Sequence, residues 1–149
     1  MAGVNYLDLA WAAGFLDGEG TISFQRHNAT SKAHPSPYFN LVLFASNSNK
    51  EALIRLQRLF GGSVASHQKV AGHKRVYRWR LYGSKAITII ALLLPYFTVK
   101  REVANLAVSY SMRPKEKLTG KLYGLTLQER DYRESVWKEF HRLNQRGAT

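Results

Sequence analysis

Residues 12–20 read Ala-Ala-Gly-Phe-Leu-Asp-Gly-Glu-Gly, and this segment constrains the chain more than any other. Small and apolar residues lead directly into an acidic turn that is flanked by glycines. Asp17 and Glu19 therefore fall at the C-terminal end of a predicted helix, where the helix dipole disfavours negative charge. A hard cation such as Mg²⁺ would offset that cost, because it takes carboxylate and carbonyl oxygens as ligands. The alternative is a pair of solvated turn residues.

The positive charge of the chain is concentrated in its middle. The net charge of the 149 residues is +12, and residues 20–101 hold thirteen Lys and Arg against one acid, Glu51. Such a one-sided field favours a polyanionic partner, through phosphate neutralisation and counterion release. The alternative is an ordinary basic surface. An anionic membrane is disfavoured, because the basic window contains no basic amphipathic helix.

Composition limits the class of protein further. At 45% apolar residues the chain can build a core, and its length predicts one domain over residues 1–149. Cysteine is absent, which excludes disulfides and thiolate metal sites. The most apolar run, residues 86–94, is far shorter than the ~20 residues of a membrane-spanning helix. We see no targeting segment and expect an intracellular protein, in a prokaryotic cytoplasm or in an organelle.

Hydrophobic periodicity predicts an α+β fold. Asn5 and Asp8 form a capping-box pattern at the first helix, and Gly61-Gly62 ends the second. The predicted helices cover residues 5–18, 49–60, 85–94, 99–111 and 127–145, and the predicted strands cover residues 21–27, 38–46, 63–70 and 75–82. This order favours one antiparallel sheet with helices on one face and polar side chains on the other.

The polar face of the predicted sheet has the chemistry of a reader of DNA bases. In the last strand Val76, Arg78, Arg80 and Tyr82 share one face, while Tyr77, Trp79 and Leu81 share the other. Gln, Asn and Arg side chains on such a face can pair with base edges in the major groove. The alternative for each residue is plain solvent exposure.

The segment 12–20 closely resembles the motif of the LAGLIDADG homing endonucleases. Ala13, Gly14, Asp17 and Gly20 match the motif letters; Phe15, Leu16, Gly18 and Glu19 are accepted variants; Ala12 replaces the leading Leu. The resemblance continues through residues 39–59, through the lysine-bearing segment 95–106, and through residues 125–147.

The resemblance implies an αββαββα fold whose saddle-shaped sheet lies in the DNA major groove. The motif helix would span about residues 6–18, and a C-terminal helical region about residues 112–149. Because the motif occurs once, the family pattern implies a homodimer. Its interface would include Asp17 and Gly14, with Ala10 or Ala13 allowing the two motif helices to approach closely.

The resemblance also implies Mg²⁺-dependent cleavage of both strands of a long, nearly palindromic DNA site, in the service of intron mobility. Glu19 and the Gly18 carbonyl would bind the metal, and Lys100 would activate water or stabilise charge. Mn²⁺ can substitute in this pattern, whereas Ca²⁺ binds without supporting cleavage. Many members use Gln to orient the attacking water; here spacing favours Asn47, with Ser46 as the alternative.

The predicted DNA contacts fall into two groups. Base contacts are expected from residues that share the parity of Glu19 and from the other strands: Thr21, Ser23, Gln25, His27, Tyr38, Asn40, Ser66, Gln68, Arg78 and Arg80. Phosphate contacts are expected from residues in or near the hairpin tips: Lys32, Lys69, Lys74 and Arg75.

Three functions remain open from the sequence. The leading hypothesis is a homodimeric, intron-encoded, site-specific DNA endonuclease. The second is an RNA-splicing maturase on the same fold, and the third is a catalytically silent DNA-binding regulator. The presence of both Glu19 and Lys100 argues against the third hypothesis but does not separate the first two, because a maturase can keep nuclease residues.

Overall fold

A computed structural model describes residues 3–28, 38–67, 72–113 and 126–146 of the chain. Within these residues the order of elements follows the sequence prediction, with boundaries that differ by one or two residues at most ends. The helices are α1 (Tyr6–Glu19), α2 (Lys50–Phe60), α3 (Gly83–Leu93), the 3₁₀ turn η1 (Leu94–Tyr96), α4 (Arg101–Met112) and α5 (Leu127–Arg146). The strands are β1 (Gly20–His27), β2 (Tyr38–Asn47), β3 (Ser63–His67) and β4 (Val76–Tyr82).

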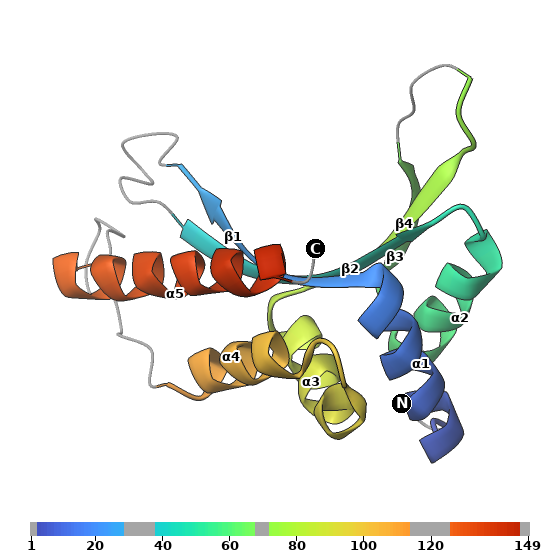
Figure 1. The fold of residues 1–149 in the computed structure, drawn as a ribbon, viewed down its shortest axis with the longest axis horizontal. Coiled ribbons are helices and arrows are strands. Elements are labelled where there is room, and N and C mark those ends of the chain that lie inside the picture. Colours follow the sequence, from blue (N-terminus) through green and yellow to red (C-terminus); the bar gives the residue numbers. More distant parts are fainter. Residues whose placement is uncertain (1–2, 29–37, 68–71, 114–125, 147–149) are drawn as a thin grey trace.

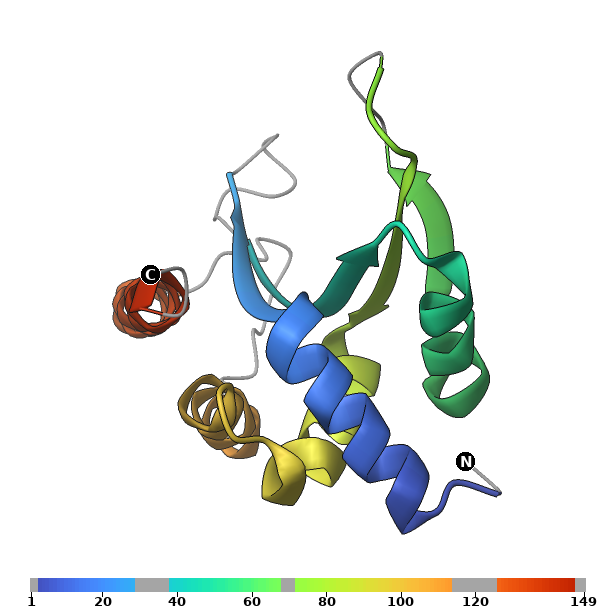
Figure 2. The same cartoon turned by 45° about the vertical axis from the view of Figure 1, so that its right-hand side comes forward.

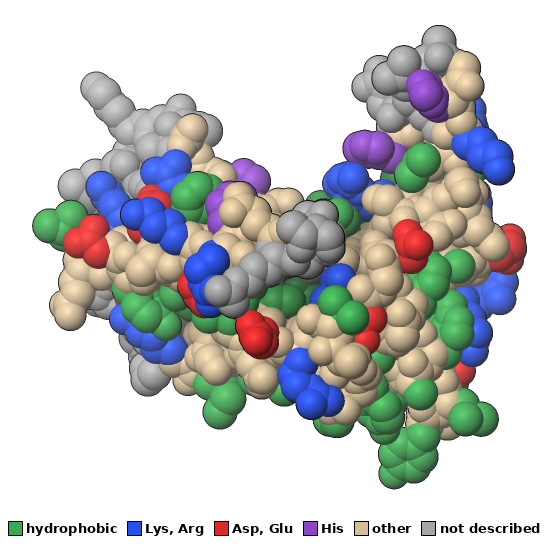
Figure 3. All heavy atoms as spheres, in the orientation of Figure 1, with side chains coloured by type: hydrophobic (Ala, Val, Ile, Leu, Met, Phe, Trp, Pro, Cys, Tyr) green, Lys and Arg blue, Asp and Glu red, His purple; other side chains and the backbone are tan. Residues whose placement is uncertain are grey.

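The four strands form one antiparallel sheet in the order β1-β2-β4-β3. The sheet is strongly curved, and its two ends rise in the view of Figure 1. The space-filling view in the same orientation shows the surface hollowed between them (Figure 3). The helices all lie outside this curve, as the view along α5 shows most clearly (Figure 2). The predicted α+β fold, with a saddle-shaped sheet and helices on one face, is confirmed.

Helix α1 begins at the predicted capping box. The Asn5 side chain accepts the Asp8 N–H at 3.0 Å, and the Asp8 carboxylate accepts the Asn5 N–H at 3.3 Å. The helix then buries Leu9, Ala12, Ala13 and Leu16 in the core. Tyr6 and Leu7, on the other side of the first turn, are about four-fifths exposed. Only one face of this largely apolar helix is therefore covered by its own chain.

The core lies between the convex face of the sheet and the helices. Fully or almost fully buried residues of the strands pack against equally buried residues of the helices and of the turn before α4. The strands contribute Ile22, Leu43, Trp79 and Leu81; the helices and the turn contribute Leu16, Leu53, Leu56, Ile90 and Phe97. The indole N–H of Trp79 donates to the Gly61 carbonyl at 2.8 Å, so this buried polar group has a hydrogen-bond partner. This packing holds the opposite, concave face of the sheet in a fixed shape.

The chain passes from α3 to α4 through a short turn. Helix α3 ends at Leu93, and Pro95 lies near the start of the 3₁₀ turn η1, where the missing proline N–H removes no helical hydrogen bond. The end of α3 therefore lies within one residue of the predicted helix end at residue 94. Phe97 then enters the core, and residues 98–100 lead into α4 beside the end of α1.

Helix α5 covers the outer edge of the sheet. Phe140 stacks on Phe24 with ring centroids 5.4 Å apart, and Arg26 forms a 2.6 Å ion pair with Glu134. Near the end of α5, the Asn144 side-chain amide donates to the Ile22 carbonyl of β1 at 3.0 Å. α5 thereby fixes the edge strand that follows the acidic motif. In the parts of the chain that the structure describes, no helix has the length and apolar character to cross a membrane.

Candidate functional site

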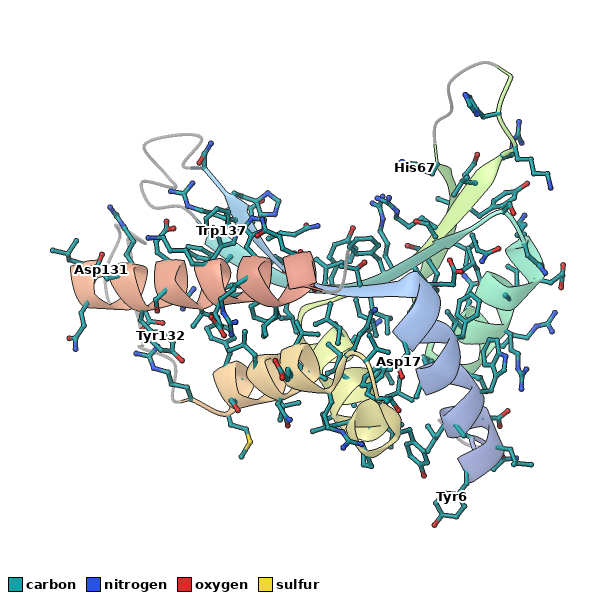
Figure 4. All side chains as sticks on the ribbon, viewed as in Figure 1. Tyr6, Asp17, His67, Asp131, Tyr132 and Trp137 are labelled. Carbon is teal, nitrogen blue, oxygen red and sulfur yellow. The ribbon has the colours of Figure 1, made fainter. Side chains whose placement is uncertain are left out.

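One carboxylate joins the C-terminal end of α1 to the start of α4. Asp17 accepts the backbone N–H of Thr98 at 2.9 Å, of Val99 at 3.1 Å and of Lys100 at 2.9 Å. These N–H groups precede or begin α4, so Asp17 places negative charge at the positive end of that helix dipole. The unfavourable position of Asp17 at the end of α1 is therefore offset by a second helix, and this acid needs no cation. Figure 4 shows Asp17 on the side of α1 that faces this connection.

Asp17 also holds the side chain of Lys100. The Lys100 ammonium donates to the backbone carbonyl of Asp17 at 2.9 Å. Burial of this side chain lowers the pKa of Lys100, and the negative charge of Asp17 opposes that shift. Asp17 thus binds Lys100 twice: its carboxylate accepts the Lys100 backbone N–H, and its backbone carbonyl accepts the Lys100 Nζ.

Gly18 and Glu19, by contrast, are exposed. Among the described residues, the Glu19 carboxylate has no hydrogen-bond or ion-pair partner. The next residue, Gly20, turns α1 directly into β1, and any Cβ at this position would lie only 2.8 Å from the Leu16 carbonyl oxygen. The lack of a side chain at this position therefore allows α1 to pass directly into β1.

Glu19 and Lys100 open onto the same cleft. Its volume is about 820 Å³, and it lies between the α1–β1 junction, the start of α4 and the end of α5. Thr21, Asn105 and Asn144 also line it. A carboxylate without an internal partner and a held ammonium thus face one solvent-filled space that could admit a phosphodiester.

The strand register assigns one set of side chains to the concave side of the sheet. Directly paired residues point to the same side, so the pairs His27–Tyr38, Gln25–Asn40, Ser46–Arg78 and Ala65–Arg78 connect across all four strands. We call this set the polar face; it comprises Thr21, Ser23, Gln25, His27, Tyr38, Asn40, Val42, Phe44, Ser46, Ser63, Ala65, His67, Val76, Arg78, Arg80 and Tyr82. Most of the predicted base-contacting residues lie on it.

The charge of the polar face is not neutralised internally. Within the described residues, neither Arg78 nor Arg80 forms an ion pair, and Arg80 donates only to the Tyr82 hydroxyl, at 3.3 Å. His27 stacks on Tyr38 with ring centroids 4.4 Å apart at the outer end of β1 and β2. In Figure 3, Lys, Arg and His side chains border the hollow at the top of the view. This surface therefore presents positive charge and hydrogen-bond donors to a ligand.

One predicted base contact lies on the wrong side of the sheet. Ser66 pairs with Tyr77, and its neighbour Val64 pairs with the buried Trp79, so Ser66 belongs to the face opposite the polar face. His67 takes the concave position instead, on the rising β3–β4 hairpin (Figure 4). The structure thus places Ser66 on the face opposite the polar face, because the residues of β3 that pair with Arg78 and Arg80 are Ala65 and Ser63.

Asn47 also departs from its predicted placement. It pairs with Tyr77, which puts it on the opposite face from Ser46, and its side-chain oxygen accepts the Asn49 N–H at 2.7 Å. Asn49 in turn caps α2 by accepting the Glu51 N–H. Asn47 is thus engaged in the turn before α2, whereas Ser46 lies on the polar face and accepts a hydrogen bond from Arg78. The structure thus places Ser46, and not Asn47, on the polar face of the sheet.

The predicted phosphate contacts are only partly within the described structure. Lys74 and Arg75 are exposed, directly before β4. Lys32, Lys69 and the predicted base contact Gln68 lie outside the described residues.

The motif helix divides the predicted interface residues into two groups. Ala10 and Gly14 are exposed, and a Cβ added at Gly14 or Gly18 would meet no atom of this chain within 4 Å. Ala13 has no exposed surface, and the Asp17 carboxylate is bound to residues 98–100. Of the two alternatives for close helix approach, Ala10 is on the exposed side of α1, whereas Ala13 faces the core of its own chain.

Sequence reasoning missed Phe44 and His67 as members of the polar face. It placed Val76 and Tyr82 on the same face as Arg78, in agreement with the strand register, but did not include them among the DNA contacts. It also missed the three hydrogen bonds of Asp17 with Thr98, Val99 and Lys100, which join positions 81 to 83 residues apart. No local pattern in the sequence encodes such a contact.

The fold and the site combine two features: a curved sheet whose concave face carries basic groups without an internal acidic partner, and an acid and a lysine beside a cleft at the end of that sheet. The chain belongs to the LAGLIDADG endonuclease family, since the model of that family matches residues 12–115.

Individual relatives agree with this assignment. An intron-encoded DNA endonuclease of Dictyostelium discoideum, ai2b, is 26% identical over 146 residues, or 90% of this chain and 47% of the relative. The chain thus spans about half the length of this curated relative. The homing endonuclease I-CvuI, in complex with its target in the presence of Ca, is 22% identical with a TM-score of 0.60 over 97% of this chain and 83% of that one. I-SmaMI bound to uncleavable DNA is 17% identical with a TM-score of 0.58 over 93% and 44% of the respective chains. These two structures share the fold of this chain.

Proposed function

We propose that this protein is an intron-encoded, site-specific DNA endonuclease that acts as a homodimer and cuts both strands of a long pseudo-palindromic site with Mg²⁺. The observation that carries the proposal is the placement of Glu19 and Lys100 on one cleft at the end of an unneutralised polar sheet face. Cleavage of this kind would serve intron mobility, in keeping with a relative that is an intron-encoded DNA endonuclease.

The curvature and charge of the sheet suit duplex DNA. The major groove is about 12 Å wide and admits a two-stranded ribbon, so that side chains of a curved sheet can follow base edges over a long site. The excess positive charge lies in residues 20–101, the part of the chain that contains all four strands. The proposed DNA partner is a polyanion, and its binding is therefore expected to weaken steeply with salt.

The uncovered face of α1 supports a homodimer. Leu7, Ala10, Gly14 and Gly18 recur at helical spacing, and all are exposed in the single chain. Apolar and small residues on one helix face permit a second helix to approach closely. A second copy of the same helix would bring two Glu19 carboxylates together at the dimer axis, beside the two strands to be cut.

The residues at the end of α1 fit a magnesium ion. Glu19 offers an exposed carboxylate without an internal partner, and the adjacent exposed Gly18 offers a carbonyl oxygen. No group of three His, Asp or Glu side chains that could hold a metal occurs in the described part of a single chain. Mg²⁺ suits such a sparse site, because it commonly binds one or two carboxylates together with water and phosphate oxygens. Bound there, it would supply Lewis-acid activation of water and stabilisation of phosphate charge.

The other residues of the cleft orient the reaction. Lys100, held by Asp17, presents a positive charge to the scissile phosphate and can donate a proton or hydrogen bond. Asn144 fixes the backbone of β1 next to the cleft, and so positions the first base-contacting residues relative to Glu19. Ser46 lies on the polar face beside this end of the sheet.

The direct test is a cleavage selection. The protein is incubated with Mg²⁺ and a library of randomised or ribosomal-gene duplex DNA, and the cut ends are sequenced. Discrete double-strand breaks at a pseudo-palindrome support the proposal. Absence of breaks, combined with tight binding to a structured intron RNA, would replace it by a splicing maturase; sequence-specific binding of DNA without breaks would replace it by a regulator.

A further inference from the structure

Arg78 is held in a defined orientation at the centre of the polar face. Its Nε donates to the Ser46 hydroxyl at 2.9 Å, and Ser46 is the residue directly across from it on β2. Its guanidinium carbon lies 4.9 Å from the centroid of the Phe44 ring, close enough for a cation–π contact. Two neighbours on one strand therefore orient the guanidinium group from two sides.

The rest of this guanidinium group has no internal partner. Arg26, Arg113, Arg133 and Arg142 each pair with a carboxylate. Arg78 forms no ion pair among the described residues, and neither Nη1 nor Nη2 has a hydrogen-bond partner there. The contact through Nε thus fixes the plane of the group and leaves the four N–H donors of its terminal nitrogens available.

Two parallel donors in a fixed plane match one base edge in particular. Guanine presents O6 and N7 as adjacent acceptors in the major groove, and a bidentate contact from Arg is the commonest specific pairing with it. Binding loses less conformational freedom when the side chain is already oriented. A phosphate contact needs no such orientation and is more typical of hairpin tips and rims, where Lys74 and Arg75 lie.

The register also locates the contact within the target. Gly20 pairs with Ala45, so Ser46 lies at the end of the sheet nearest Glu19. The stacked pair His27 and Tyr38 lies at the other end, seven residues along β1, which is roughly 23 Å at the rise of a strand. Arg78, directly across from Ser46, therefore faces the inner part of each DNA half-site, closer to the cut than the bases beneath His27.

We propose that Arg78 recognises a guanine in the inner part of each half-site, and that Ser46 and Phe44 act as positioning residues for it. The inference rests on the proposed function, because it requires duplex DNA on the polar face. It adds a specificity-determining residue and one identified base to that function.

The test is a base-preference profile measured by binding, so that it does not depend on cleavage. The protein, Arg78→Lys, Ser46→Ala and the matched control Lys74→Ala select from a duplex library randomised around the target site, and bound sequences are counted. Arg78→Lys keeps the charge but not the planar pair of donors. Thermal melting of each variant verifies that it is folded.

The unaltered protein is expected to prefer G at one inner position of each half-site by about 10- to 100-fold. Arg78→Lys should reduce this preference to a few-fold at that position alone. Ser46→Ala should reduce it partly at the same position, which a merely structural role of Ser46 would not do. Lys74→Ala should weaken binding evenly across all sequences.

Two results would overturn the inference. One is a uniform loss of affinity in Arg78→Lys without any change in base preference, which would make Arg78 a phosphate contact. The other is a profile without an inner guanine in the unaltered protein. If the unaltered protein selects no DNA sequence at all, the proposed function itself fails, and this outcome is distinct from both.

Discussion

The junction of α1 with α4 and the polar face of the sheet satisfy their polar groups in opposite ways. At the junction, Asp17 and Lys100 are joined to each other and to backbone groups by four hydrogen bonds. On the polar face, Arg78 and Arg80 carry charge that no acid of the described chain neutralises. A reacting group must be oriented before substrate arrives, whereas a recognition surface must keep its donors free for the ligand.

Glu19 is an exception to this contrast. It adjoins the junction of α1 with α4, yet its carboxylate has no partner among the described residues. If it binds the metal, Glu19→Gln should lower single-turnover cleavage by at least about 10³-fold, the upper range for removing one electrostatic stabiliser. DNA affinity should stay nearly unchanged, since the residue is exposed and contributes little packing. Quench-flow cleavage and filter binding measure the two quantities.

The matched control is Glu102→Gln, which removes an exposed acid that lines the same cleft. It should leave cleavage within a few-fold of normal. Equal losses in the two variants would mean that net charge in the cleft, and not a ligand at Glu19, sets the rate.

The bare face of α1 makes a second comparison possible, between the covered and uncovered sides of one helix. A Cβ at Gly14 meets no atom of its own chain within 4 Å, so Gly14→Leu should fold and even favour the helix by up to about 1 kcal/mol. It should nonetheless yield a monomer, because two α1 helices could no longer approach. Loss of the second DNA contact should weaken binding to a full site by about 10²- to 10³-fold.

Light scattering and titration with full-length and half-length sites measure these effects. Ala91→Leu adds bulk to an exposed position of α3 and serves as the control. A Gly14→Leu protein that remains a dimer would eliminate α1 as the interface.

The hydrogen bonds of Asp17 can be tested within the junction itself. Asp17→Asn removes the charge and turns an N–H donor toward the backbone N–H groups of Thr98, Val99 and Lys100. The lysine should lose its fixed position, and single-turnover cleavage should fall by roughly tenfold to 10²-fold, as for a small misplacement of a reacting group.

Asp8→Asn provides the matched control at the other end of α1. Asp8 belongs to the capping box and lies 3.6 Å from Arg55, so its loss should also reduce stability. It should not change the cleavage rate of the folded protein. A rate loss of the same size in both variants would show that helix stability, rather than the position of Lys100, is responsible.

These comparisons also explain how far the sequence could predict the molecule. Periodicity and capping predicted the order of elements, because Asn5, Gly61 and Pro95 act through their own turns. Family resemblance drew attention to Glu19 through the motif and to Lys100 through the segment 95–106, and the structure brings both residues to one cleft. The sequence could not predict the properties that depend on tertiary contacts or on strand register.

Ser66 and Ala13 show why the placement of a side chain depends on register and on packing. The face that Ser66 occupies depends on how β3 pairs with β4, and a shift of one residue reverses every side chain of a strand. Ala13 is small and apolar, as an interface residue of α1 would be, but α1 is apolar on both faces. Only the packed structure tells which alanine faces the core.

A cluster of charged side chains between α4 and α5 lies remote from the cleft and differs from the candidate site. Glu129 in the first turn of α5 is almost fully buried and is bound by Arg113 at 2.7 Å and by Arg133 at 2.8 Å. Burial acts to raise the pKa of Glu129, but the hydrogen bonds and charges of Arg133 and Arg113 outweigh it and lower the pKa below 4.5. The cluster joins the residue after α4 to α5 and serves stability.

The pH dependence of stability follows from the direction of that shift. Since the folded-state pKa is depressed, the contribution of Glu129 is fully present above about pH 4.5 and is lost as the pH falls through the folded-state pKa. Glu129→Gln should reduce the free energy of unfolding by roughly 1–3 kcal/mol at pH 7, because the partly buried guanidinium groups of Arg113 and Arg133 lose their charged partner. Urea denaturation between pH 3 and pH 7 should show the difference between the two proteins shrinking below pH 4.5.

The exposed pair of Glu139 with Arg142 is the control, and Glu139→Gln should change stability little at any pH. A difference that stays constant down to pH 3 would mean that Glu129 stabilises the α4–α5 contact by packing and not by charge.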